Sequence, residues 1–196
     1  MSQKNITFKF VTTEGERYEV QRLYHDSLVF DGIIPIQKSG IVNMYPHLDS
    51  IENSRVLIVQ KDGKIIGTSS ITDAKKTQTP ADIYFIKEME HLRSRNNKIC
   101  AIWRTCTDPN YRRTPSLIKS IFQQILLFII DNKYEEIVSC INPENETFYH
   151  KALKFNTIGR IKIMQDEPIS IGTVLMHGIV KDIPKYWQRA EYLLHT

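Results

Sequence analysis

The chain has 196 residues and a net charge of +4, and 41% of its residues are apolar, 24% charged and 10% aromatic. This composition is typical of a folded globular protein and excludes disordered and collagen-like chains. The longest apolar run, 125–130, is far shorter than the roughly 20 residues that a membrane span needs. No signal-peptide core stands near the N-terminus, so we expect a cytoplasmic protein.

The first half of the chain predicts a strand, a helix and a hairpin. Alternating apolar residues predict a strand over 6–11, and Thr13 with Glu16 forms a capping box for a helix over 14–29. Two β-branched runs, 55–60 and 64–71, are joined by Asp62-Gly63, a pair typical of tight hairpin turns. A polar loop over 74–80 and a helix or irregular segment over 81–92 follow.

The second half alternates strands with helices. A strand over 99–107 ends at Asp108-Pro109, and Thr114 caps a core helix that begins at Pro115, where the missing proline N–H costs nothing, and runs to about 132. Later patterns predict a strand over 136–141, a short helix over 144–154, and strands over 155–164 and 172–180. The aromatic segment 181–196 could pack on its own domain or on a partner. Nothing divides the chain, so we expect a single domain over 1–196.

Basic residues gather in one segment of the chain. Residues 93–119 hold seven lysines and arginines and one acid, a local excess of +6. Such a segment attracts nucleic acid, a phosphorylated cofactor or an acidic protein. Because no nucleic-acid-binding motif accompanies it, we expect no nucleic-acid partner. The three cysteines, 100, 106 and 140, lack metal-ligand spacing and indicate small core residues rather than a disulfide framework or a metal site.

The loop before the Pro115 helix could bind an anion. Backbone N–H groups and the helix dipole favour negative charge at a helix N-terminus, and Arg112 and Arg113 stand just before it. These features alone fit a phosphate-binding loop and a solvated basic turn equally well.

Two motifs resemble those of a known enzyme family. Residues 142–158, NPENETFYHKALKFNTI, followed by Gly159 and Pro168, resemble the C-terminal signature of N-acyl amino acid synthases. Residues 101–112, AIWRTCTDPNYR, are similar to an E-x-x-R strand and D-P-x-Y-R loop that those enzymes share with acyl-homoserine-lactone (autoinducer) synthases. With Asp49, Gly67-Thr68 and the element order, the resemblance covers about 14–180. It implies a GNAT-like N-acyltransferase fold, an α/β (α+β) domain with a mixed, mostly antiparallel twisted sheet flanked by helices.

The resemblance implies an N-acyltransferase. It would move an acyl group, expected to be fatty, from a phosphopantetheine thioester to the amine of an amino acid or similar small molecule. Acyl carrier protein or acyl-CoA would be the co-substrate, with no tightly bound cofactor or metal. Pro115 and Leu117 stand where the superfamily usually has glycines around a pyrophosphate, which favours the acidic carrier protein with its single phosphate. The alternatives are an acetyl-CoA-dependent acetyltransferase and a catalytically impaired protein that binds an acyl chain or carrier protein.

The same resemblance assigns candidate site residues. Arg104 falls on the active-site arginine, and Tyr149 or His150 on the position that protonates the leaving thiolate. The donor is expected at Thr105, Cys106, Thr107, Tyr111, Arg112, Arg113, Thr114 and Ser116, and the acceptor or acyl pocket at Asp49, Ser70, Trp103 and Phe148.

Two positions depart from the family pattern and favour the impaired alternative. Ala101 replaces the strand glutamate, a candidate base for the amine, and Ser70 replaces an arginine. Positions 101 and 104 face opposite sides of a regular strand, so only a bulge would bring them together. The remaining candidate bases, each of which could equally be a surface or capping residue, are Asp108, His25, His150 and Glu52.

Overall fold

The computed structural model describes residues 6–49, 54–96, 98–161 and 172–188. Within them, a first compact unit holds residues 6–70 and 104–125, and a second unit holds 71–103 and 126–188. Glu52 and Pro168, which the sequence analysis singled out, lie outside the described residues. The single domain over 1–196 stays a prediction.

The strands among the described residues are β1 (Ile6–Phe10), β2 (Ser54–Lys61), β3 (Lys64–Asp73), β4 (Ile99–Thr107), β5 (Glu136–Ile141), β6 (Asn156–Ile161) and β7 (Thr173–Ile179). Hydrogen bonds join these strands in the order β1-β2-β3-β4-β5-β7-β6. The β4–β5 pair is parallel, and the β1–β2, β5–β7 and β6–β7 pairs are antiparallel. The mixed, mostly antiparallel sheet was therefore predicted correctly.

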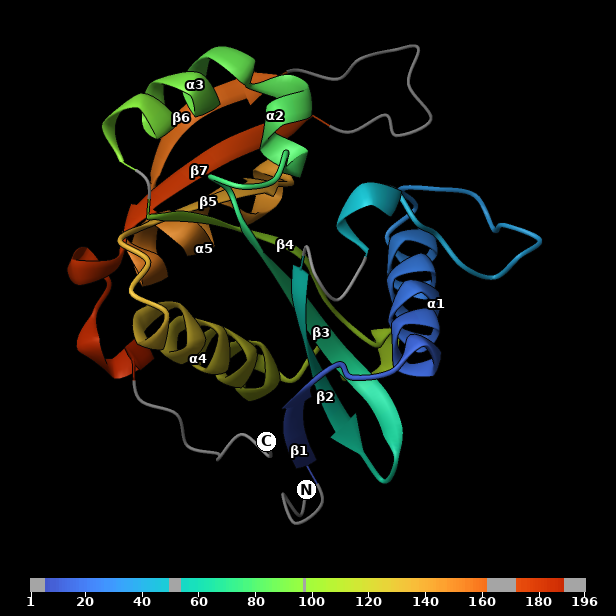
Figure 1. The fold of residues 1–196 in the computed structure, drawn as a ribbon. Helices are drawn as coiled ribbons and strands as arrows, with labels where there is room; N and C mark the ends of the chain where they lie inside the picture. The colour runs from blue at the N-terminus through green and yellow to red at the C-terminus, as the bar shows by residue number, and fades with distance from the viewer. Residues whose placement is uncertain (1–5, 50–53, 97, 162–171, 189–196) are drawn as a thin grey trace. The chain divides into compact units, whose positions relative to one another are not determined.

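In the first unit, helix α1 (Glu14–Phe30) lies alongside the β2–β3 hairpin (Figure 1). The predicted capping box is present: the Thr13 hydroxyl accepts the Glu16 N–H, and the Glu16 carboxylate accepts the Thr13 N–H. Both hairpin-turn residues, Asp62 and Gly63, have positive φ, at 52° and 79°, as a type I′ turn requires. An apolar cluster beneath α1 includes Val11, Val20, Leu23, Val56, Ile58, Ile65 and Cys106.

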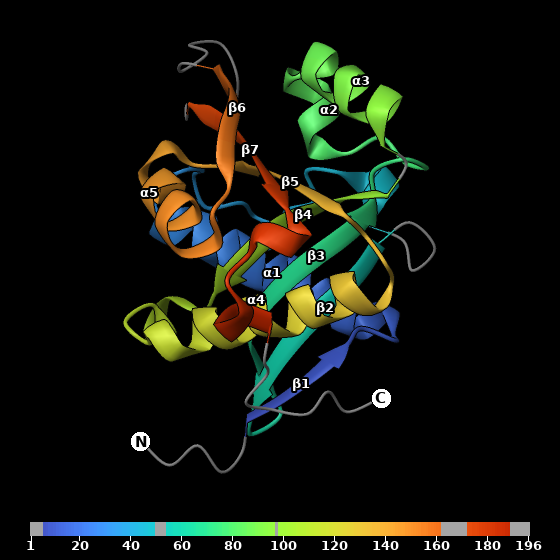
Figure 2. The ribbon, with the colours of Figure 1, turned by 90° about the vertical axis from the view of Figure 1, so that its left-hand side faces the viewer.

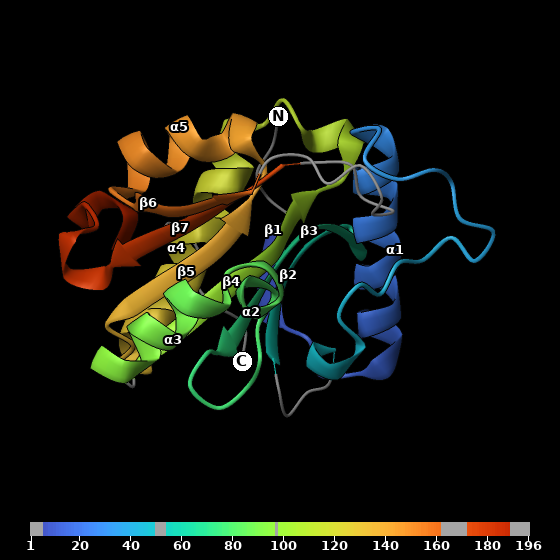
Figure 3. The ribbon, with the colours of Figure 1, turned by 90° about the horizontal axis from the view of Figure 1, so that it is seen from above.

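In the second unit, helices cover both faces of strands β5, β7 and β6 (Figures 2 and 3). Helices α2 (Pro80–Tyr84) and α3 (Ile86–Arg95) lie on one face, where one helix or an irregular segment over 81–92 was predicted. Helix α5 (Glu146–Phe148) and the π-helical turn Tyr149–Leu153 lie on the other face. The predicted helix over 144–154 is therefore a composite, which begins with the 3-10 turn Pro143–Asn145 and ends at Lys154 with a φ of 62°.

Helix α4 (Pro115–Asp131) begins at the predicted proline, and its residues Ile121, Ile125, Leu126 and Ile129 are buried as predicted. No helix in the described part of the chain combines the length and apolarity of a membrane span. The described part of the C-terminal segment contains the 3-10 turns Val180–Asp182 and Lys185–Gln188.

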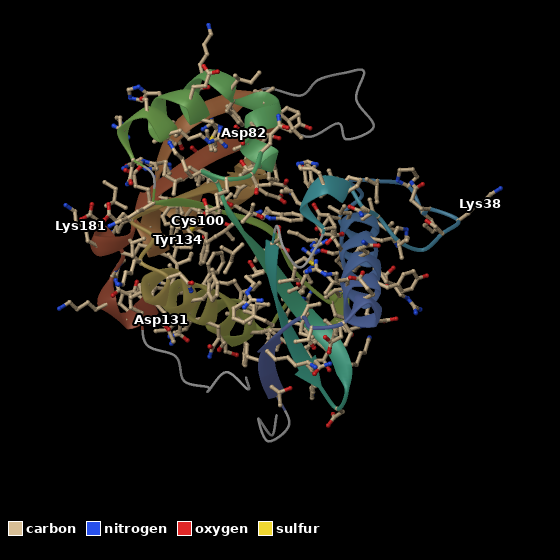
Figure 4. All side chains as sticks on the ribbon, in the orientation of Figure 1. Lys38, Asp82, Cys100, Asp131, Tyr134 and Lys181 are labelled. Carbon is tan, nitrogen blue, oxygen red and sulfur yellow. The ribbon has the colours of Figure 1, made fainter. Side chains whose placement is uncertain are left out.

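The three cysteines are free thiols, and Cys100 and Cys106 are buried as predicted, whereas Cys140 is half-buried. Cys100 lies beside Tyr134 inside the second unit (Figure 4). Burial raises the pKa of the Cys106 and Cys140 thiols to about 12. These pKa values favour the inert thiol form.

Candidate active site

Arg104 interrupts strand β4. Its φ of 52° lies in the left-handed region, which residues other than glycine rarely adopt inside a strand. The backbone of β4 is therefore irregular at this residue. Such a conformation costs roughly 1–3 kcal/mol and persists only where the surrounding contacts hold it.

The Arg104 side chain reaches a buried group of charges in the first unit. Its Nη1 lies 2.9 Å from Asp49 Oδ1 and 3.0 Å from Oδ2, and its Nε donates to Ser70 Oγ at 3.2 Å. Arg17 of α1 places its Nη1 3.6 Å from Asp49 Oδ1, and the Gln21 amide donates to Asp49 Oδ2 at 2.7 Å. Three of the predicted site residues, Arg104, Asp49 and Ser70, are thus brought together.

Sequence reasoning missed Arg17 and Gln21. They stand four residues apart on α1, a spacing that places two side chains on one helix face, and this polar pair was the available signal. We call Arg17, Asp49 and Arg104 the buried charge triad, because their side chains are only 2–3% exposed.

The buried charge triad carries two positive charges and one negative charge. Burial lowers the pKa of Arg17, as does the charge of Arg104, while Asp49 and Glu14 oppose this shift. Among the described residues, Arg17 Nε and Nη1 have no hydrogen-bond partner. The group would therefore gain from a further anion, and a carboxylate matches the planar guanidinium best.

Asp108 is a poor candidate base. Burial raises its pKa, but hydrogen bonds from Lys64 Nζ, at 2.6 Å, and from the Asn110 N–H outweigh burial, and the net pKa is lowered. His25 is also engaged: its Nε2 accepts the Gln37 N–H, and its Nδ1 lies 2.9 Å from Asp26 Oδ1. Asp108 is therefore a weak base, and both ring nitrogens of His25 are engaged.

The loop after β4 is fixed within the first unit. Arg112 Nη2 donates to Ser27 Oγ at 2.7 Å and to Asp31 Oδ2 at 2.6 Å, so it anchors the loop to the end of α1. Arg113 is exposed and forms no ion pair with any residue that the structure describes. The other predicted loop residues range from half-buried to exposed: Tyr111, Thr114 and Ser116.

The predicted donor residues on β4 are held by neighbours in the first unit. Thr105 Oγ1 lies 2.8 Å from Ser69 Oγ, Cys106 packs in the apolar cluster beneath α1, and Thr107 is buried. Their side chains therefore serve packing and hydrogen bonding, which leaves backbone groups of this stretch as the candidate donor contacts.

In the second unit, the two candidate acids, Tyr149 and His150, lie in different surroundings. Tyr149 is buried. Burial raises the pKa of Tyr149 to about 12, although Ser139 of β5 acts in the opposite direction. The His150 side chain is 39% exposed, with Nδ1 2.6 Å from the Phe155 carbonyl and Nε2 3.0 Å from Thr157 Oγ1.

The two remaining candidates, Trp103 and Phe148, are held by neighbours in the second unit. Trp103 Nε1 donates to Thr72 Oγ1 at 2.9 Å, and Phe148 packs edge-to-face on Tyr149 and on Trp187. The Trp187 contact shows that the described part of the C-terminal segment packs on its own unit. Ala101 is 3% exposed in an apolar cluster that includes Ala74, Phe85, Met89, Leu92 and Leu175.

Comparisons with known proteins agree with this fold. The family model for N-acyl amino acid synthase FeeM matches residues 19–177. The chain is similar to the structure of FeeM from uncultured soil microbes, with a TM-score of 0.74 and 18% identity over 90% of this chain and 92% of that one.

Two acyl-homoserine-lactone synthases are also similar to the chain. BjaI, a CoA-dependent enzyme solved with SAM and isopentyl-CoA, has a TM-score of 0.64 and 13% identity over 93% of this chain and 86% of that one. LasI has a TM-score of 0.64 and 10% identity over 97% of each chain. No curated protein matches the sequence. These structures confirm the predicted GNAT-like fold.

Proposed function

The chain belongs to the N-acyl amino acid synthase FeeM family and is an N-acyltransferase, and from this premise we propose that it transfers a fatty acyl group from acyl carrier protein to the amine of an amino acid. The reaction breaks the thioester C–S bond and forms an amide C–N bond. The amine loses one proton and the leaving thiolate gains one, so the reaction balances without an oxidant or a metal.

The observation that carries the acceptor assignment is the buried charge triad. Two arginines share the one carboxylate of Asp49, and Arg17 keeps Nε and Nη1 without hydrogen-bond partners among the described residues. Burying an excess positive charge is costly unless an anion joins it. The α-carboxylate of an amino acid supplies that anion, and an amine without a carboxylate does not.

The donor assignment rests on the loop before α4. Pro115 and Leu117 occupy places where glycines would let the backbone enclose a pyrophosphate. A carrier-borne phosphopantetheine has a single phosphate, for which exposed Arg113 and the first N–H groups of α4 suffice. This loop supports a carrier protein as donor over free CoA.

The proton chemistry follows from the groups available. Ala101 cannot accept a proton, and Lys64 already neutralises Asp108. The acceptor ammonium therefore loses one proton to water and attacks the thioester carbonyl as the neutral amine; after the C–N bond forms, the nitrogen releases a second proton to water, which replaces the one that Tyr149 gives up. Tyr149 stays protonated because its pKa is raised to about 12, and it donates to the departing sulfur.

Steady-state kinetics with paired acceptors tests the acceptor assignment. The pairs are amino acids and the amines that match them without the carboxylate, and thiol release from acyl carrier protein is the signal. Arg17→Met leaves Asp49 paired with Arg104, so folding is retained while the excess positive charge is removed. We expect the KM for amino acids to rise about 10- to 100-fold, as for one lost charged hydrogen bond, and the KM for the amines to stay unchanged.

Arg55→Met is the matched control, because Arg55 is exposed on β2 and stacks on the Phe10 ring. Equal turnover of acids and amines by the unaltered protein would refute the acceptor assignment. Turnover of acetyl-CoA but of no carrier-borne thioester would refute the donor assignment and identify a small-acyl acetyltransferase.

A further inference from the structure

The side-chain amide of Gln21 contacts the buried charge triad in the first unit. Its Nε2 donates to Asp49 Oδ2 at 2.7 Å, and Arg104 Nη1 lies 3.0 Å from the same oxygen. Because an ionised carboxylate only accepts hydrogen bonds, this contact fixes which end of the amide is the nitrogen. The carbonyl oxygen of Gln21, Oε1, is therefore the end of the amide that is turned away from Asp49.

This carbonyl oxygen is an acceptor without a donor. Among the described residues, the Gln21 side chain bonds to Asp49, and no group donates to its Oε1. Gln21 is half-buried, whereas the side chains of the buried charge triad are only 2–3% exposed. Of the described side chains that contact Asp49, Gln21 is thus the one that a small molecule can reach from solvent.

Arg17 and Gln21 offer complementary groups to one small molecule. They stand four residues apart on α1, a spacing that places their Cβ atoms about 5–6 Å apart on one helix face. Both side chains meet the same carboxylate, since Arg17 Nη1 lies 3.6 Å from Asp49 Oδ1 and Gln21 binds Oδ2. Arg17 Nη2 donates to the Ser54 carbonyl at 3.4 Å, which leaves Nε and Nη1 without hydrogen-bond partners among the described residues. Donors for an anion and an acceptor for an N–H group are therefore carried by neighbouring side chains.

We propose that Gln21 is a specificity-determining residue, whose Oε1 accepts a hydrogen bond from the amino group of the acceptor while Arg17 binds its carboxylate. This inference rests on the proposed function, in which Arg17 binds that carboxylate. In an α-amino acid one carbon separates the two groups, which matches the close approach of Arg17 and Gln21 at Asp49. In a γ-amino acid three carbons separate them, so an isomer held at Arg17 carries its amine past Gln21. The acceptors are therefore α-amino acids.

The hydrogen bond to Gln21 also orients the nucleophile. A neutral amine has two N–H groups and one lone pair, so fixing one N–H limits the directions in which the lone pair points. As the C–N bond forms and the thioester C–S bond breaks, the nitrogen becomes positively charged and then releases its proton to water. A charged donor makes the stronger hydrogen bond, so Gln21 stabilises the attacking state more than the resting amine. Gln21 itself takes no proton.

The test compares α-aminobutyrate with its isomer γ-aminobutyrate as acceptors. The two have the same atoms, an amine and a carboxylate, and differ in the distance between these groups. Thiol release from acyl carrier protein gives kcat/KM for each isomer, and the unaltered protein should prefer the α isomer. Gln21→Met has a similar size and no hydrogen-bonding amide. It should lower kcat/KM for the α isomer about tenfold, the effect of one hydrogen bond, and leave that for the γ isomer unchanged.

Gln21→Lys separates a contact with the substrate from a contact with Asp49. Its ammonium donates to Asp49 but cannot accept a hydrogen bond, so it should lose the preference for the α isomer as Gln21→Met does. Glu19→Met is the matched control, because Glu19 is exposed and stands two residues earlier, on a different face of α1. It should keep the preference, and thermal unfolding checks the fold of each variant.

A second readout needs no turnover and uses the unaltered protein. With nitrogen-15 labelling, Gln21→Met identifies the side-chain amide resonances of Gln21. Saturating α-aminobutyrate should shift these resonances, and γ-aminobutyrate should shift them less.

Three results would overturn the inference and leave the proposed function standing, because that function is tested by acids against amines without a carboxylate. They are equal kcat/KM for the two isomers in an active unaltered protein, a full rate of Gln21→Lys with the α isomer, and Gln21 resonances that do not respond to α-aminobutyrate. An unaltered protein that releases no thiol with any donor and acceptor overturns the proposed function and the inference with it.

Discussion

Restoring the missing glutamate at position 101 should damage the protein rather than activate it. The family pattern has a glutamate here, so Ala101→Glu is the obvious repair. The Ala101 side chain, however, is 3% exposed and belongs to an apolar cluster with Ala74, Phe85, Met89 and Leu92. Four further heavy atoms and a charge do not fit there without displacing these side chains. Overpacking costs about 1–3 kcal/mol and an unpaired buried charge about 3–5 kcal/mol, so we expect a loss of about 4 kcal/mol or more.

The pH dependence of the free energy of unfolding separates the cost of overpacking from the cost of the buried charge. Burial raises the pKa of the introduced carboxyl in the folded state above its value of about 4.3 in the unfolded chain. The folded state then binds more protons, so the free energy of unfolding falls as the pH rises above the unfolded pKa. Ala101→Gln has a similar size without the charge and should lose stability equally at all pH values.

Urea unfolding of Ala101→Glu, Ala101→Gln and the unaltered protein between pH 4 and pH 8 measures both effects. The Glu variant should approach the Gln variant at the acid end and fall below it at the alkaline end. If the Glu variant is as stable as the unaltered protein at pH 8 and releases thiol faster, the apolar assignment of this position is wrong.

Three further predictions concern single contacts. Thr13→Ala should cost about 1 kcal/mol in urea unfolding by removing the cap of α1, and Thr13→Ser should cost little. Burial raises the pKa of Asp82, but hydrogen bonds from Arg93 and from Thr79 outweigh it and lower the net pKa; its stabilisation is present above the unfolded pKa and disappears as the pH falls through the lowered value. Asp82→Asn should therefore cost about 3 kcal/mol at pH 7 and flatten the acid limb of a stability curve; an unchanged limb would contradict this. Gly178→Ala should cost about 1–3 kcal/mol in the same assay, because a Cβ there would overlap the ring of buried Phe155.

Local signals predicted most of the fold. The Thr13 cap, the Asp62-Gly63 turn and Pro115 at the start of α4 act through the backbone of adjacent residues, so they can be read without knowing what packs nearby. The family motifs added the element order and, through it, the GNAT-like fold. The strand over 99–107 has the predicted bounds for the same local reason.

Contacts between residues distant in sequence explain why two helical segments differ from the prediction. The segment 81–92 becomes two helices that meet at Phe85, whose ring occupies the space left by Gly159, more than seventy residues later in the sequence. The segment 144–154 widens into a π-helical turn, which is closed by the bond from the Phe155 N–H to the Tyr149 carbonyl. Helical periodicity contains neither contact, so it predicts a helix or an irregular segment over 81–92 and one short helix over 144–154.

Contacts between distant residues also change how the positive charge of residues 93–119 acts at the candidate site. Five of its seven basic residues form ion pairs with acids outside the segment: Arg93 with Asp82, Arg95 with Glu136, Lys98 with Glu135, Arg104 with Asp49 and Arg112 with Asp31. A charge count along the chain cannot include these partners, so it overstates the field that a carrier protein would meet. Arg113, exposed and without an ion pair among the described residues, therefore becomes the strongest candidate for donor recognition. A long-range attraction would be spread over many lysines and arginines, whereas here Arg113, beside the N-terminus of α4, contributes most to it.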